Sequence, residues 1–132
     1  MKANELMIDD WVYNKNINEP MQVYSMMFSQ MFRTRPDATT EDYNIFSIPL
    51  TAEILEKNGF KKHKYQYIHQ DNYCKVCVSI APRIEIDGMD LGNPPINVSI
   101  DGALFDINIS ISAVHELQHA LRLCGINKEI VL

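Results

Sequence analysis

Apolar and polar residues alternate most clearly between residues 65 and 111. Apolar side chains recur at every second position in three runs: Cys74, Val76, Val78 and Ile80; Ile96, Val98 and Ile100; Phe105, Ile107, Ile109 and Ile111. A period of two is typical of strands that bury one face. Turn signals lie between the runs, at Asp87-Gly88, at residues 92–95 and at Asp101-Gly102. The pattern predicts an antiparallel β-meander over residues 65–111.

Two other segments carry the start and stop signals of helices. In residues 51–59, Thr51 can accept hydrogen bonds from the first amides, and Gly59 can adopt the left-handed conformation that ends a helix. Residues 113–124 have apolar side chains at helical spacing, with Ser112 as the expected cap. We therefore expect a short helix over 51–59 and a C-terminal helix over 113–124. The apolar side of the second helix, including Cys124, is expected to pack on the sheet.

The first third of the chain predicts a small β unit over residues 1–48. Residues 6–13 are apolar and aromatic around Asp9-Asp10, and residues 14–20 have the composition of a turn. Residues 21–32 fit a strand or a helix equally well. Residues 34–42 resemble a polar loop, and residues 43–48 a strand that stops at Pro49. The sequence as a whole predicts one α+β domain over residues 1–132: an N-terminal β unit, a short helix, an antiparallel meander and a C-terminal helix packed on the sheet.

Charge and composition narrow the possible functions. The chain has 132 residues, enough for one domain with a real core, and a net charge of −5. A negative net charge argues against a general nucleic-acid-binding protein, which needs clustered basic residues to contact phosphates. The one basic cluster, at residues 61–64, is expected to be a solvated loop. A nucleic-acid module built on the N-terminal strands and on aromatics such as Trp11 and Tyr13 is therefore the weaker alternative.

The lack of a recognisable targeting signal and the pattern of cysteines predict a cytoplasmic location. The N-terminal residues include no continuous apolar segment of the signal-peptide kind, and no apolar run approaches the length of a membrane span. Three cysteines form no disulfide framework. Cys74 and Cys77 form a C-x-x-C pattern, but in a strand positions three apart point to opposite faces. We expect both to be structural, and we expect no contact with a membrane.

The segment Val114-His115-Glu116-Leu117-Gln118-His119 contains H-E-x-x-H. In zinc peptidases this motif supplies two metal ligands and a general base, here His115, His119 and Glu116. A third ligand is not evident, because Arg122 and Gly125 stand where one class of these enzymes has glycine and histidine. An upstream ligand such as His63, His69 or an acid stays possible. We favour a solvated polar helix face, with Arg122 between the two histidines, and expect no cofactor; zinc is the alternative.

Three stretches together resemble a set of small uncharacterised proteins from Bacteroides-type gut bacteria and their phages and mobile elements. They are Leu6–Val12, with the sequence L-M-I-D-D-W-V; Ile48–Phe60, which contains I-P-L-T-A-E-I-L; and Val114–Leu132, which begins V-H-E-L-Q. Asp9 stands where those proteins often have glycine, which puts a tight turn there in doubt. Many of them have V-H-Q-L-Q-N in the helix, so the shared residues are His115, Leu117 and Gln118. The resemblance implies no activity.

By elimination and by this resemblance, the sequence predicts a non-enzymatic protein-interaction module of phage or mobile-element origin, with an unidentified protein partner. Its candidate binding surface is the polar side of the last helix: His115, Gln118, His119 and Arg122. The alternative is a zinc-dependent hydrolase or peptidase with His115 and His119 as ligands and Glu116 as the base. It requires a third ligand within about 2 Å of a metal held by both histidines.

Overall fold

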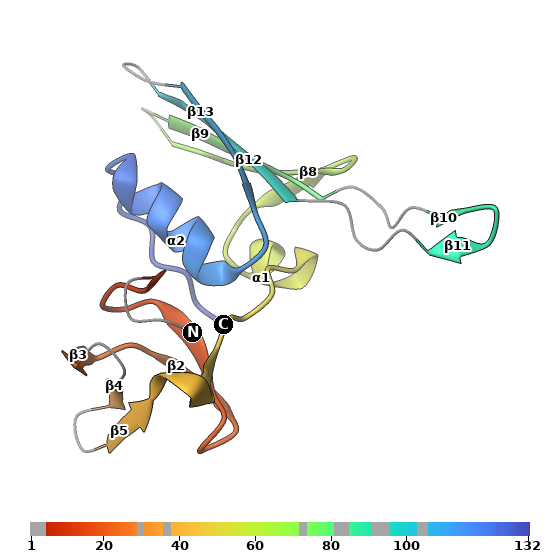
Figure 1. Ribbon diagram of the computed structural model, residues 1–132. Coiled ribbons are helices and arrows are strands. Elements are labelled where there is room, and N and C mark those ends of the chain that lie inside the picture. The colour runs from red at the N-terminus through yellow and green to blue at the C-terminus, as the bar shows by residue number, and fades with distance from the viewer. Residues whose placement is uncertain are drawn as a thin grey trace. The chain divides into compact units, whose positions relative to one another are not determined.

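The α+β chain folds into two units, and each of them contains antiparallel β-sheet (Figure 1). The computed structural model describes residues 5–28, 31–35, 38–71, 74–80, 85–90, 96–102 and 106–132. Unit one comprises Met1–Pro49 and Ala113–Ala120, and unit two comprises Leu50–Ser112 and Leu121–Leu132. The N-terminal β unit therefore ends close to the expected residue 48, but it also includes most of the C-terminal helix. That one domain spans residues 1–132 stays a prediction.

Unit one contains two small antiparallel sheets. The first has the order β2-β1-β6, with β2 (Glu19–Gln22), β1 (Trp11–Asn14) and β6 (Ile45–Phe46). The second has the order β3-β4-β5, with β3 (Ser25–Phe28), β4 (Met31–Arg35) and β5 (Ala38–Glu41). The 3-10 helix η2 (Asp42–Asn44) leads into β6. The turn expected over residues 14–20 is shorter than predicted, because β1 extends to Asn14 and β2 begins at Glu19.

Residues 21–48 contain more strand than their composition suggested. The described part of residues 21–32 is strand wherever it is regular, which answers the question that the sequence left open. The polar loop expected over 34–42 is wrong, because Thr34 and Arg35 end β4 and Ala38–Glu41 form β5. Thr39 and Thr40 pair with Arg33 and Phe32. Threonine is β-branched and favours strands despite its polarity. The strand expected over 43–48 is only the two-residue β6.

A small core and a buried amide hold unit one together. Leu6, Val12, Val23 and Ile45 form one buried cluster. The Asn14 side chain is buried as well, and its Nδ2 donates to Thr34 Oγ1 at 3.0 Å and to Thr40 Oγ1 at 2.9 Å. Because Asn14 lies in β1 and the two threonines lie in β4 and β5, this amide links the two sheets. Its polar atoms are satisfied, as burial requires.

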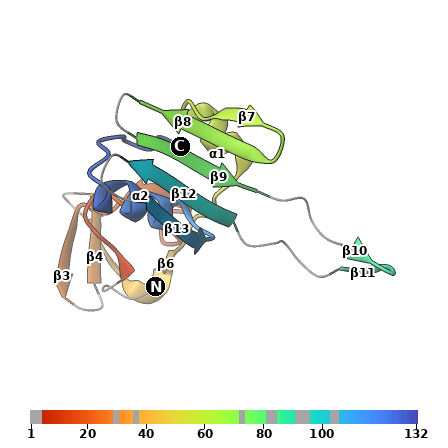
Figure 2. The same ribbon diagram turned by 90° about the horizontal axis from the view of Figure 1, so that it is seen from above.

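Unit two is built on the expected meander (Figure 2). Its five strands have the order β13-β12-β9-β8-β7 and all pair antiparallel. They are β7 (Lys61–His63), β8 (Gln66–Gln70), β9 (Cys74–Ser79), β12 (Ile96–Gly102) and β13 (Asp106–Ile111). The basic residues 61–63 are exposed, but they form an edge strand, which corrects the loop that was expected there. The sheet therefore begins at Lys61, earlier than residue 65.

The alternation of side chains agrees with the sequence pattern in β9 and β12, whereas in β13 the apolar residue Ile109 is exposed. Val76, Val78, Val98 and Ile100 are fully buried. Cys74 and Cys77 lie three apart in β9, so their side chains point to opposite faces, as expected. Asp87 and Gly88 form the expected turn, with φ of 52° and 75°, in the hairpin of β10 (Glu85–Ile86) and β11 (Met89–Asp90). Asp101 and Gly102 belong to β12, which corrects the turn expected at these two residues. The loop expected at 92–95 and residues 103–105, including Phe105, lie outside the described residues.

Both helices form close to where they were expected. In α1 (Ala52–Lys57), Thr51 Oγ1 accepts the Ile54 N–H at 3.3 Å, and Gly59 takes φ +83° beyond the end. The helix α2 (Val114–Leu123) begins one residue later than predicted, which corrects the assignment of Ser112 as its cap. Cys124 lies past the end of α2 and is half-buried, so it is not the core residue that was expected. No described helix has the length and apolar character of a membrane span.

Candidate functional site

A tight turn precedes β1. The Asp10 N–H donates to the Met7 carbonyl at 3.2 Å, and Asp10 Oδ2 accepts the Met7 N–H at 2.7 Å. Asp9 has φ 70°, the left-handed conformation that glycine adopts most readily. The tight turn therefore forms, although Asp9 stands where the similar proteins often have glycine. Asp can adopt this conformation at a cost that Gly avoids, and the contacts around the turn must offset that cost.

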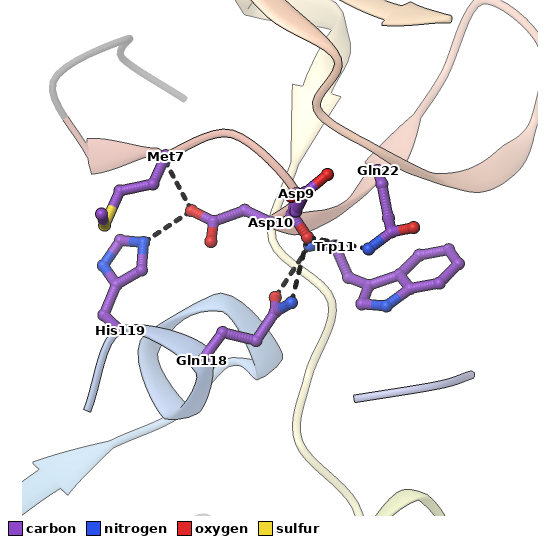
Figure 3. A network of polar contacts seen from close by, with 7 residues as sticks. All are labelled: Met7, Asp9, Asp10, Trp11, Gln22, Gln118 and His119. Carbon is purple, nitrogen blue, oxygen red and sulfur yellow. Dashed lines mark hydrogen bonds and ion pairs between the residues drawn. The ribbon is translucent and has the colours of Figure 1, made fainter. Parts of the chain in front are cut away.

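The side-chain amide of Gln118 pairs with the main chain on either side of Asp10 (Figure 3). Gln118 Oε1 accepts the Trp11 N–H at 2.8 Å, and Gln118 Nε2 donates to the Asp9 carbonyl at 3.1 Å. The Gln118 side chain is buried. An amide that bonds the C=O of one residue and the N–H two residues later satisfies both groups, as a neighbouring strand would. Gln118 thus fixes the entry of β1 against α2.

His119 is held by Asp10 (Figure 3). His119 Nε2 lies 2.5 Å from Asp10 Oδ2, the oxygen that also accepts the Met7 N–H. An ionised carboxylate only accepts, so with Asp10 ionised the ring nitrogen donates this hydrogen bond. The Asp10 side chain is fully buried, and the His119 side chain is 31% exposed. A zinc-binding imidazole needs a free lone pair on its ligating nitrogen, and in this arrangement Nε2 does not offer one.

His115 is buried beside His119. The residue is only 8% exposed, and its Nδ1 has no hydrogen-bond partner among the residues that the structure describes. The two imidazole rings meet edge to face, with centroids 5.6 Å apart. Burial lowers the pKa of His115 below its ordinary value of 6.5, and His119 acts in the same direction, against the raising effects of Asp10, Glu116 and Glu5. The neutral form of His115 is therefore favoured in the folded chain.

Glu116 contacts the beginning of its own helix. Its Oε1 accepts the Ala113 N–H at 3.2 Å. Ala113 immediately precedes α2, so Glu116 is the third residue of the helix and makes half of a capping box. A carboxylate in the first turn also interacts favourably with the helix dipole. The residue that would be the general base of a zinc peptidase therefore has a structural contact.

The described residues do not assemble a metal centre around the motif. They contain no group of three or more His, Cys, Asp or Glu side chains that could hold a metal ion. Asp10 is the acid beside His119, and it contacts Nε2, one of the two ring nitrogens through which a histidine can bind a metal. The other proposed upstream ligands, His63 and His69, belong to β7 and β8 of unit two. The contacts of Glu116 and His119 therefore suit hydrogen bonding within unit one better than coordination of zinc.

The polar side of α2 is not the solvated face that the helical pattern predicted. His115 and Gln118 are buried, and His119 and Arg122 are half-buried. That expectation is wrong because Gln118 and His119 contact the turn before β1. The helical pattern alone cannot show such a contact. A binding role for the four residues stays a prediction. Sequence reasoning also missed Asp10, whose one visible signal is a charged pair, Asp9-Asp10, inside an apolar segment.

The sheet β2-β1-β6 has one aromatic side. Cross-strand partners share a face, and Tyr13 pairs with Pro20 on one side and with Phe46 on the other. Trp11, two residues before Tyr13, lies on the same face. We call Trp11, Tyr13, Pro20 and Phe46 the aromatic face. Phe46 is 45% exposed, with Lys15 Nζ 5.8 Å from its ring centroid. The alternate residues Val12 and Ile45 are buried, so the two sides of this sheet differ.

No protein-family model, curated protein or solved structure matches the chain.

Proposed function

We propose that the protein is a non-enzymatic interaction module that binds a protein partner through the aromatic face of unit one. The observation that carries the proposal is the cross-strand row Pro20–Tyr13–Phe46, which leaves Phe46 exposed. Exposed aromatic side chains on a rigid element are typical of protein interfaces. The net charge of −5 disfavours nucleic acid as the partner. An origin in a phage or mobile element and a cytoplasmic location are part of the proposal and rest on the sequence alone.

In this proposal the polar side of α2 acts mainly by positioning. Gln118 holds the main chain of Trp11, and Asp10 is held by His119. Both contacts fix the residues that lead into β1 and its aromatic face. His119 is the member of this set that keeps accessible surface, and it can contribute directly to binding. The zinc-hydrolase alternative has less support, because Glu116 and His119 already have structural contacts.

Site-specific photo-crosslinking in a host that expresses the protein tests the proposal. A photoreactive phenylalanine analogue is placed at Phe46, and a matched control carries it at Tyr65, an aromatic residue of unit two that is 62% exposed. We expect one recurrent protein adduct at position 46 that excess wild-type protein competes away and that Tyr13→Ser weakens. Equal adducts at both positions, or none at position 46 that wild-type protein competes away, would overturn the proposal.

A further inference from the structure

A pocket in unit two is lined mainly by basic and imidazole side chains. Its volume is about 440 Å³, and its lining includes Gly59, Lys61, Lys62, His63, His69 and Gln70. The pairing of β7 with β8 stops at Lys61 and Ile68, so His69 and Gln70 continue past the end of β7. The pocket thus lies beside the edge strand β7 and extends past its first residue, Lys61. Pockets of about 300–1,000 Å³ are the usual size for small-molecule ligands.

A third lysine approaches the pocket from the C-terminal segment. Lys128 Nζ lies 6.0 Å from the centroid of the Phe60 ring, and a Cβ built at Gly59 would be 4.0 Å from the same nitrogen. The Phe60 ring in turn contacts His69, with centroids 5.5 Å apart. Lys62 pairs with Tyr67 and therefore shares a face of the sheet with His69, whereas Lys61 and His63 lie on the opposite face. The basic and imidazole residues thus line the pocket from both faces of the sheet edge, in a chain whose net charge is −5.

The described carboxylates form no ion pair with the lysines of this cluster, Lys61, Lys62 and Lys128, although Asp71 interacts with His69. Burial lowers the pKa of His69, and Lys128 lowers it further, against a smaller raising effect of Asp71. Like charges held close together repel one another, and a bound anion relieves that repulsion. The cluster has the electrostatics of an anion site.

We propose that this pocket binds a small molecule that carries a phosphate group. Lysine is a common phosphate ligand that acts as a point charge, and a phosphate group carries about −1.5 to −2 charges at pH 7, more than a carboxylate, so several lysines attract it more strongly. The imidazoles of His63 and His69 and the amide of Gln70 add further hydrogen-bond donors for phosphate oxygens. The site belongs to unit two and does not depend on the function proposed for unit one.

Titration with inorganic phosphate, followed by NMR of backbone amides and imidazoles, tests the site. The control titration uses sodium acetate at the same pH and ionic strength. We expect saturable shifts at Gly59, Lys62 and His69 with phosphate and not with acetate. Because one partly screened charge contributes up to about 1 kcal/mol, Lys62→Gln is expected to weaken binding by up to about fivefold. Lys61→Gln is the second variant, and both side chains are exposed, so the fold should persist.

Lys15→Gln is the matched control, because it removes the same charge in unit one. It is expected to leave phosphate affinity unchanged. The inference is overturned if phosphate causes no saturable shift at these residues or if acetate causes the same shifts. It is also overturned if Lys15→Gln weakens binding as much as Lys62→Gln.

Discussion

The Trp11 N–H donates to the side-chain oxygen of Gln118 at 2.8 Å, although the two residues lie 107 positions apart in the sequence. The same amide reaches the Asp9 carbonyl with its nitrogen. A helix at the C-terminal end of the chain thus completes the hydrogen bonding of a turn near the N-terminus. This contact gives the H-E-x-x-H helix a structural role without any metal.

Removing the Gln118 amide should destabilise the protein. Gln118→Ala removes the acceptor of the part-buried Trp11 N–H, at a cost of about 1–3 kcal/mol in the free energy of unfolding. Gln118→Glu keeps an acceptor for Trp11 and loses the donor to Asp9, so it tests the two bonds separately. The measurement is urea unfolding at equilibrium. Gln22→Ala is the control, because Gln22 donates to the same Asp9 carbonyl but is exposed, and its loss should cost less than about 0.5 kcal/mol.

Replacing Asp9 by glycine should stabilise the protein. Asp9 has φ 70°, where a side chain is strained, and Gly relieves the strain at some entropic cost in the unfolded chain. The expected gain is about 0.5–1 kcal/mol. Asp9→Ala is the matched variant and should be destabilising, since Ala tolerates this conformation less well than Asp. Thermal unfolding of the three proteins compares them, and a lower melting temperature for Asp9→Gly than for wild type contradicts the assignment.

Asp10 and His119 should be energetically coupled. Asp10 is fully buried and accepts from both Met7 and His119. Asp10→Ala is expected to cost about 2–4 kcal/mol, because two donors lose their acceptor. A double-mutant cycle with His119→Ala should give a coupling energy of about 1–2 kcal/mol. Additive effects of the two substitutions in urea unfolding would show that the contact contributes nothing.

Stability should fall as the pH drops below about 6.5, the ordinary pKa of histidine. Burial lowers the pKa of His115 in the folded chain, so the unfolded chain binds protons more readily. The stabilising contribution is present above the unfolded pKa and is lost as the pH falls from there through the folded value. His69 has a lowered pKa as well and adds to the same trend. Unfolding free energies measured between pH 5 and 8 should show a smaller slope for His115→Gln, and an unchanged slope argues against this origin.

Local signals in the sequence predicted those helices and strands whose own residues determine their structure. The alternation around Val76 and Val98 predicted the meander, and Thr51 and Gly59 marked the ends of α1. Polar strands such as β5 were missed, because polarity also marks loops and the pairing partner decides between them. The boundary of α2 differed by one residue at its cap, within the usual uncertainty of helix ends.

The candidate site was harder to predict because its parts meet only in the folded chain. A helical wheel places His115 and His119 on one side of α2, and that much was correct. It cannot show that Asp10 and the main chain of Asp9 cover this side. The left-handed conformation of Asp9 likewise depends on contacts with α2 and with Val23, whose carbonyl accepts the Asp9 N–H at 2.8 Å.

The central claim is that H-E-x-x-H in this chain is a structural element of unit one, and the zinc content per chain tests it most directly. The sample is untagged protein, purified without chelator, dialysed and analysed beside His119→Ala. The account predicts far less than one zinc per chain in both proteins, because His119 Nε2 is committed to Asp10 and the described residues supply no third ligand. Zinc near one per chain that disappears in His119→Ala would contradict it and favour the hydrolase.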